Sequence, residues 1–179
     1  MNILGLSGSL RANSSNARLL RAAAGLAPTG VTFTFYDEQL AQLPAFNPDL
    51  DGEDATPPPQ VALLRQLLAA AKGILVCCPE YAHGVPGAFK NALDWTVSSG
   101  EFTDKPVVML MASPSGARRA LAALEPTLLV LGARLLAQHS VVLVPSHLDA
   151  ANSIRNAAVE TVVRQSLDIL VTDMLAREN

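Results

Sequence analysis

Long apolar blocks alternate with mixed segments along this 179-residue chain. Five blocks that are rich in apolar residues predict strands at residues 2–7, 31–36, 73–78, 106–112 and 139–144. The third block, GILVCC, and the fourth, PVVMLMA, contain no polar side chain, which indicates strands that are covered on both faces, as in a parallel sheet. The fifth strand is the least defined, since ARLLAQHSVVLV can hold one long strand or two short ones.

The segments between these blocks carry apolar residues at helical spacing. They predict helices at residues 14–26, 59–72, 86–98, 117–132 and 153–177, and we expect Pro126 to distort or restart the fourth helix. Strand–helix units in series predict an α/β fold, a doubly wound sheet with helices on both faces. The polar stretch at residues 43–59 is too short to separate domains, so we expect a single domain over residues 1–179 and a functional loop within it.

The composition narrows the class of protein. Half of the residues are hydrophobic, 16% are charged and the net charge is −3, which gives no electrostatic reason to expect nucleic-acid binding. No apolar run reaches the roughly 18 residues of a membrane helix, so no membrane association is expected. Cys77 and Cys78 are neighbours on one strand and should point to opposite faces, which indicates reduced core thiols. With no leader pattern at the N-terminus, these thiols favour a cytoplasmic protein.

Ligands of such sheets bind beyond the carboxyl ends of the strands, which directs attention to the loops at residues 7–16, 79–86 and 113–116. The first loop, SGSLRANSSN, places hydroxyl and amide side chains and one cation before a helix N-terminus, an arrangement that suits a phosphate monoester. The glycine spacing matches neither the dinucleotide nor the P-loop motif. An ordinary N-cap beside a solvated arginine is the alternative. The candidate donors are Ser9, Arg11, Ser14, Ser15 and Asn16.

The second loop begins the stretch PEYAHGVPGAFKNALDW, and its prolines and glycines fix its shape. Its backbone can offer N–H and C=O groups to the edge of a flat heterocycle. His83 alone could be a general acid or a metal ligand, but no second ligand has suitable spacing, so no metal site is expected. The alternative to a role in catalysis or binding is that the His83 side chain hydrogen-bonds the backbone and that Glu80 caps the following turn. In the third loop, ASPSGARR, the residues Ser113, Ser115 and Gly116 either approach a ligand or form a turn and an N-cap.

Two of these stretches carry a family resemblance. GSLRANSSN resembles the signature G-S-x-R-x-x-S-x-N, and the second stretch resembles P-E-Y-N-x-x-x-P-G-x-L-K-N-A-x-D-W. Both are signatures of the NADPH-dependent FMN reductase family, which LPAFNPDL also resembles, and the likeness runs from Asn2 to about Gly132. The resemblance implies a flavodoxin-like five-stranded parallel sheet of order 2-1-3-4-5. It also implies noncovalent FMN, NADPH or NADH as co-substrate, and a homodimer or dimer of dimers.

The resemblance assigns roles to individual residues. The candidate donors of the first loop would hold the FMN phosphate, and Ser113 would close the site. The isoalloxazine ring would be bordered by Pro79, Glu80, Tyr81, His83 and Gly84. Two departures stand out: Ala82 replaces the family's usual asparagine, and the third loop is shorter than usual, which leaves Ser115 and Gly116 in doubt.

These features together predict a flavin-dependent oxidoreductase. Electrons would pass from NAD(P)H through the flavin to a small acceptor such as a quinone, a flavin, an azo compound or a metal oxyanion. We name no catalytic side chain, because the flavin carries the chemistry and a proton can come from solvent or from His83. One alternative is a flavodoxin-type electron carrier, against which the modest charge and 4% aromatic content count. Another is a nucleotide transferase or phosphatase, which lacks a nucleophile with an adjacent base.

The helix after Pro86 suggests how subunits associate. Its aromatic content includes Trp95, a residue type enriched in interface cores, and the resemblance implies that dimers form through this region. The 43–50 loop would then reach towards the partner's flavin. The alternative is that Phe89, Leu93 and Trp95 belong to the protein core and that Lys90 pairs with Asp94.

Overall fold

The computed structural model describes residues 1–52 and 55–177; residues 53 and 54, in the middle of the predicted 43–59 loop, lie outside the described residues. Its centre is a parallel five-stranded sheet with the order β2-β1-β3-β4-β5, which confirms the predicted fold class and strand order. The strands are β1 (Asn2–Ser7), β2 (Thr32–Tyr36), β3 (Gly73–Cys77), β4 (Pro106–Ala112) and β5 (Arg134–Val141).

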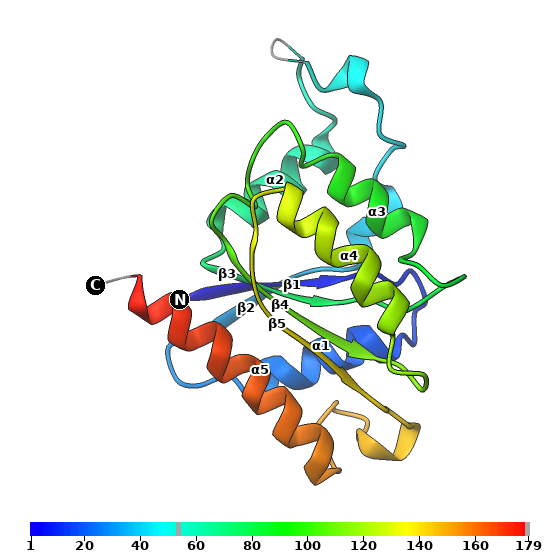
Figure 1. Cartoon of the computed structure of the whole chain (residues 1–179), viewed down its shortest axis with the longest axis vertical. Coiled ribbons are helices and arrows are strands. Elements are labelled where there is room, and N and C mark those ends of the chain that lie inside the picture. The colour runs from blue at the N-terminus through cyan, green and yellow to red at the C-terminus, as the bar shows by residue number, and fades with distance from the viewer. Residues whose placement is uncertain (53–54, 178–179) are drawn as a thin grey trace.

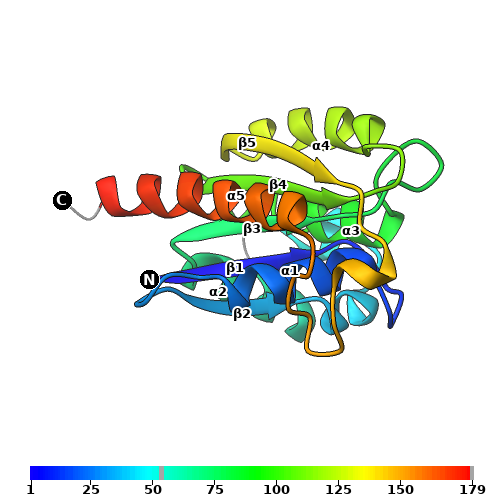
Figure 2. The same cartoon turned by 90° about the horizontal axis from the view of Figure 1, so that it is seen from below.

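Helices cover both faces of this sheet (Figures 1 and 2). One face packs against α1 (Ser15–Gly25) and α5 (Ala157–Ala176), and the other against α2 (Pro59–Ala70), α3 (Gly87–Asp94) and α4 (Arg118–Val130). Cys77 belongs to the first hydrophobic layer and Cys78 to the second, so the two thiols are free and buried on opposite faces, as predicted. Burial raises the pKa of both thiols, which leaves them poor nucleophiles. No helix in the described ranges has both the length and the apolar character needed to cross a membrane.

The predicted ranges differ from the structure by up to five residues. The largest difference is at β5, which begins at Arg134, five residues before the predicted start, because this edge strand is only partly buried and polar residues at 138–140 interrupt its apolar run. The third helix ends at Asp94 and the last begins at Ala157, each four residues inside its predicted range. The expected restart of the fourth helix is wrong, since α4 continues through Pro126. Leu124 and Leu128, on either side of the proline, are both fully buried and hold the helix on the sheet.

The 43–52 loop is anchored to the C-terminal end of α3. Asn91 bonds it twice, accepting from the Phe46 backbone N–H at 2.7 Å and donating to the Pro44 carbonyl at 2.9 Å. The indole Nε1 of Trp95 donates to the same carbonyl at 2.9 Å, and its ring meets Phe46 edge to face. Trp95 is fully buried, so it belongs to the protein core, as the alternative interpretation predicted, and its side chain is not part of a surface that could contact a second subunit. Beyond these anchors, the short helix η2 (Pro48–Leu50) extends past α2 and α3 (Figure 1).

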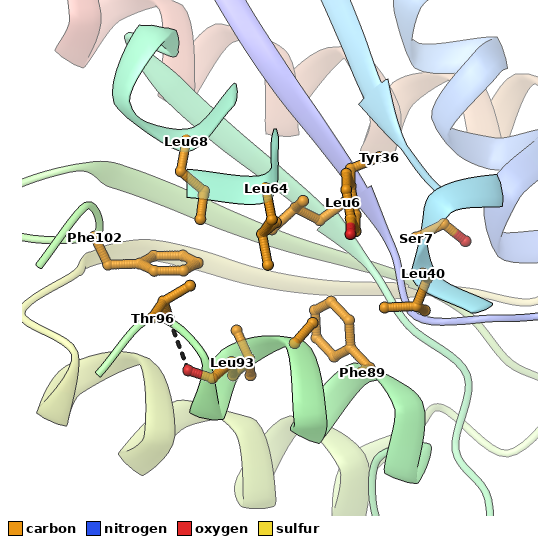
Figure 3. A pocket seen from close by; sticks show the side chains of 11 residues that line it. Leu6, Ser7, Tyr36, Leu40, Leu64, Leu68, Phe89, Leu93, Thr96 and Phe102 are labelled. Atoms are coloured by element: carbon orange, nitrogen blue, oxygen red, sulfur yellow. Dashed lines mark hydrogen bonds between the residues drawn. The ribbon is translucent and has the colours of Figure 1, made fainter. Parts of the chain in front are cut away.

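A small closed cavity lies between the sheet and helices α2 and α3 (Figure 3). Its volume is about 10 Å³, and apolar side chains such as Leu6, Leu64 and Phe89 line most of it. The Tyr36 hydroxyl, buried here, has no hydrogen-bond partner among the described residues, and burial raises its pKa to about 12. This space is far too small for an organic cofactor. An organic cofactor therefore has to bind outside this cavity.

The carboxyl ends of β1, β3 and β4 meet at one edge of the sheet (Figure 1). Ser7 pairs with Cys77, and the N–H of Gly8 donates to the Cys77 carbonyl at 3.0 Å, so the first loop starts directly against the second. A Cβ at position 8 would lie 2.4 Å from the Cys78 sulfur. Only glycine therefore lets these two loops approach so closely.

Candidate functional site

Three hollows open beside the first loop, and the largest, of about 680 Å³, lies between this loop, α1 and the segments around Asp37 and Asn152. The other two adjoin the second loop as well. The first of these two has a volume of about 180 Å³ and receives residues from all three predicted loops; we call it the polar hollow. The second, of about 400 Å³, is walled mainly by aliphatic and aromatic side chains, and we call it the apolar hollow. Arg11 and Tyr81 line both. The polar hollow is lined by Ser9, Arg11, Ser14, Ser15, Asn16, Pro79, Glu80, Tyr81, Ala112, Ser113 and Pro114.

Most of the predicted site residues are therefore together. The structure places nine of them in the polar hollow, while His83 and Gly84 line neither space. Sequence reasoning missed the apolar walls. The sequence did contain a signal, because Leu10 lies between the predicted donors Ser9 and Arg11, and Val85 and Pro86 follow the second predicted turn. In the structure, Leu10 is 55% exposed. Large apolar side chains that stay exposed inside a motif mark a contact surface.

The first loop ends in a helix N-cap whose hydroxyl can still donate a hydrogen bond. Ser14 caps α1, its Oγ accepting from the Ala17 N–H at 3.3 Å, and Ser9 Oγ accepts from the Arg11 N–H at 3.3 Å. Both serines are buried, and each hydroxyl retains a hydrogen that it can donate. The N–H groups at the start of α1 have no intrahelical partner, so this end of the helix is a concentrated donor site.

Arg11 differs from the other arginines of α1 and its loop. Arg18 donates to Asn152 and to the Asp149 carbonyl, and Arg21 pairs with Asp37 at 2.7 Å. The guanidinium of Arg11 is exposed and makes no hydrogen bond or ion pair with any described residue. It is therefore a cation available to a ligand at the boundary of the two hollows.

Asn16 has a role that its sequence position did not reveal. Its Nδ2 donates to the Ala112 carbonyl at 3.1 Å, and its Oδ1 accepts from the Ala112 N–H at 2.8 Å. The side chain is buried and joins the start of α1 to the end of β4. The two bonds to Ala112 fix the position of the Asn16 amide, which leaves the backbone N–H and the second hydrogen of Nδ2 as the groups that Asn16 could offer a ligand.

The second loop contains a tight turn. The N–H of Tyr81 donates to the Gly84 carbonyl at 3.0 Å, and the N–H of Gly84 donates back at 2.9 Å. The two central residues, Ala82 and His83, have positive φ values of 49° and 63°, as in a type I′ turn. Asparagine and glycine favour this conformation, whereas alanine is strained in it. The N–H groups of Ala82 and His83 bond no described residue and remain available to the edge of a ligand.

The carboxylate of Glu80 points to the start of α4. Its Oε2 accepts from the backbone N–H groups of Arg119 and Ala120, at 2.9 and 3.1 Å, at the start of α4. The bond from Ala120 is the main cause that lowers the pKa of this carboxyl, followed by the bond from Arg119 and the nearby charge of His83. The predicted alternative, a capping role, thus applies to a distant helix and not to the following turn.

The third loop contributes Ser113. This buried serine lines the polar hollow, and its Oγ accepts from the Ser115 N–H at 3.2 Å. Ser115 and Gly116 line neither hollow, in keeping with the shortness of this loop. His83 is largely exposed, with Nδ1 3.8 Å from a Glu80 oxygen. Within residues 1–52 and 55–177, no group of three or more His, Cys, Asp or Glu side chains is placed to hold a metal ion.

Comparison with known proteins tests the resemblance. The sequence pattern of the NADPH-dependent FMN reductase family matches residues 1–147. An NAD(P)H-dependent FMN reductase of Pseudomonas aeruginosa is 32% identical over 176 residues, which cover 95% of this chain and 93% of that enzyme. A 2-hydroxy-1,4-benzoquinone reductase of a Burkholderia species is 43% identical over 89 residues, 49% of this chain and 45% of that protein.

A solved structure agrees with these relatives. The flavoenzyme NAD(P)H:(acceptor) oxidoreductase FerB of Paracoccus denitrificans superposes with a TM-score of 0.83 and 25% identity, covering 96% of this chain and 97% of FerB. The family pattern spans all three loops and the polar and apolar hollows described above. This chain therefore belongs to the NADPH-dependent FMN reductase family of flavin-dependent oxidoreductases.

Proposed function

We propose that FMN binds across the two hollows, with its phosphate in the polar hollow and its ring along the apolar hollow. The observation that carries this proposal is the unpaired guanidinium of Arg11 at the boundary between them. When bound, the flavin accepts two electrons from a reduced nicotinamide and passes them to a small acceptor. The rest of the proposal concerns what this chain does to hold and orient it.

The polar hollow suits a phosphate monoester. The hydroxyls of Ser9 and Ser14 each have a hydrogen to donate, and the first turn of α1 adds the N–H groups of Ser15 and Asn16. Arg11 supplies one full positive charge, and the N-terminus of α1 adds a partial one. Ser113 would close the hollow from the third loop. This set of donors with one cation suits a terminal phosphate, which carries a charge of about −1.5 to −2 at neutral pH.

The apolar hollow suits a flat heterocycle with one polar edge. Leu10, Tyr81 and Val85 supply apolar walls for a ring, and Tyr81 remains 51% exposed, so the wall stays open to solvent. The N–H groups of Ala82 and His83 would meet the polar edge of the ring, with the chain from Pro79 to Gly84 forming the border. An open wall leaves room for a nicotinamide or an acceptor to approach the ring.

No side chain in the site is placed as an obligatory acid or base. The carboxylate of Glu80 is occupied by α4, and burial leaves both thiols protonated. The His83 side chain is 72% exposed, so any proton it carries exchanges freely with solvent. We propose that protons reach the site from water, with His83 as an optional relay.

The chemical class of the electron acceptor can be proposed from the names of the relatives and from the exposure of the apolar hollow. Reductases of a benzoquinone, of other quinones and of azo compounds are among the curated relatives. We propose a small flat acceptor of the quinone type, reduced at the exposed wall of the apolar hollow. NADPH is the proposed donor on the family's name alone, with NADH as the alternative. The 179 residues would form one flavin-binding domain, and the two free thiols support a cytoplasmic setting.

We also propose a homodimer or a dimer of dimers. Leu50, beside the anchored loop, is 45% exposed, and Val97, beyond α3, is 63% exposed. They flank a hydrogen bond that Ser98 donates to Asp51 at 2.6 Å, which ties the loop to the end of α3. Exposed apolar side chains beside such a fixed loop are typical of a surface that a second subunit covers.

The first test concerns association. Light scattering after size exclusion should give the mass of two or four wild-type chains. Val97→Asp should shift the protein towards the monomer, because it places a charge in an apolar contact. Val142→Asp, at a similarly exposed position after β5, is the matched control and should leave the mass unchanged. A flavin-loaded wild-type monomer at micromolar concentration would contradict the proposal.

The second test concerns the phosphate. Arg11→Ala should weaken FMN binding by about 10- to 150-fold, since a hydrogen bond to a charged group contributes roughly 1.5–3 kcal/mol. Riboflavin has no phosphate, so its affinity should change little. Fluorescence quenching measures both affinities. Lys72→Ala removes a positive charge at the opposite edge of the sheet and should affect neither ligand. Equal losses for FMN and riboflavin in Arg11→Ala would remove Arg11 from the phosphate.

The third test concerns the strained turn. Ala82→Asn should tighten both FMN and riboflavin by about threefold to tenfold if the turn opens in part of the flavin-free protein, because asparagine accepts the left-handed conformation that costs other residues roughly 1–2 kcal/mol and so raises the fraction that is ready to bind. Ala82→Val should weaken both, since a branched side chain fits a positive φ poorly. The same titration reads both variants. If asparagine and valine leave the affinities equal to wild type, the shape of this turn does not govern ring binding.

A further inference from the structure

We propose that Glu80 is a positioning residue whose carboxylate fixes the Tyr81–Gly84 turn against the start of α4, so that the turn's free N–H groups face the flavin ring. This inference rests on the proposed function, because it concerns how the ring-bordering turn is held. It assigns Glu80 no contact with the flavin through its side chain.

The start of α4 needs a cap from elsewhere. Its N-cap residue is Ala117, which has a φ of 51° and no side chain that can accept a hydrogen bond. The first N–H groups of a helix lack intrahelical partners and need acceptors. Glu80 supplies one oxygen to two of them, at 2.9 and 3.1 Å, and its side chain is only 15% exposed.

Charge makes this cap stronger than a neutral one. Arg118 and Arg119 occupy the first turn of α4, where positive side chains oppose the helix dipole. A carboxylate at the same place offsets both arginines and interacts favourably with the positive end of the helix. Its hydrogen bonds are charge-assisted, and such bonds are about twice as strong as neutral ones.

The turn has little else to hold it. Its two internal hydrogen bonds join Tyr81 to Gly84, and both central residues adopt a left-handed conformation that their side chains disfavour. Among the described residues, the two bonds accepted by Glu80 are the hydrogen bonds that link residues 80–84 to a distant element. The side chains of Tyr81 and His83 are exposed and add little packing. The orientation of the turn therefore depends on the residue that immediately precedes it.

This placement predicts a signature that differs from that of the phosphate site. If the turn is released, the ring loses its partners whether or not a phosphate is present. Glu80→Ala should therefore weaken FMN and riboflavin by the same factor, about tenfold, which is the lower end of the range for losing a charged hydrogen-bond partner. Glu80→Gln keeps an oxygen that can accept from the same two N–H groups, so it should stay within about threefold of wild type.

The experiment titrates wild type, Glu80→Ala, Glu80→Gln and Glu125→Ala with FMN and riboflavin by fluorescence quenching. Glu125 lies further along α4, and its replacement is the matched control for removing a glutamate without touching the cap. Amide hydrogen exchange on the flavin-free proteins gives a second readout. Exchange should accelerate at Tyr81 and Gly84, whose N–H groups form the internal hydrogen bonds of the turn, in Glu80→Ala but not in Glu80→Gln. If Glu80→Ala does not fold, Glu80→Gln and the shorter Glu80→Asp are compared instead. Only Glu80→Asp should then bind flavin more weakly and show faster amide exchange in the turn.

Several results would overturn the inference. Glu80→Ala that binds both flavins like wild type would reduce Glu80 to a helix cap. A loss of affinity for FMN alone would place Glu80 at the phosphate. An equal loss of affinity in Glu80→Gln would show that the negative charge of Glu80, and not its hold on the turn, supports flavin binding. If wild type binds neither flavin, the proposed function fails instead, while the exchange data on the flavin-free protein still decide whether Glu80 holds the turn.

Discussion

The first loop passes the end of β3 at a distance that only glycine allows. The Gly8 N–H bonds the Cys77 carbonyl, and any side chain at position 8 would collide with the Cys78 sulfur. This contact fixes where the donors of α1 lie relative to the second loop. Because Cys78 is itself fully buried, the sulfur cannot move aside, and the separation of the two loops is set by the packing of the sheet.

Two longer-range contacts complete the arrangement. The Asn16 amide holds the start of α1 to the end of β4, and Glu80 holds the second loop to the start of α4. Each element that borders the two hollows is thus bonded to a neighbour. A site assembled in advance avoids the cost of ordering loops on binding. Arg11 has no hydrogen-bond or ion-pair partner among the described residues, so its charge remains available to a ligand.

The sequence predicted the parts of this protein whose physics is local. Apolar blocks indicated the sheet and its helices. The run from Ser9 to Asn16 indicated a cluster of polar donors, because hydroxyl groups and a helix N-terminus adjoin each other in the chain, and the structure places this cluster in one hollow. Its role in holding a phosphate stays a prediction. The edge strand β5 was placed less well, since its pairing with β4 and not its own pattern defines its start.

Roles that depend on distant partners could not be predicted. Asn16 looks like a phosphate donor until the backbone of Ala112, 96 positions away, occupies both ends of its amide. Glu80 looks like a ring contact until Arg119, 39 positions away, occupies its carboxylate. Trp95 looks like an interface residue, yet the Pro44 carbonyl gives its indole a partner inside the core. In each case the residue type was identified as important, and tertiary structure decided what it does.

A crystal structure of the complex with FMN tests the central claim most directly. We expect the phosphate in the polar hollow, with a guanidinium nitrogen of Arg11 about 2.7–2.9 Å from a phosphate oxygen. We expect the ring along the apolar hollow, with its polar edge at the N–H groups of Ala82 and His83. A flavin whose phosphate lies away from Arg11, or whose ring leaves the Tyr81–Gly84 turn uncontacted, would show that FMN binds in another way.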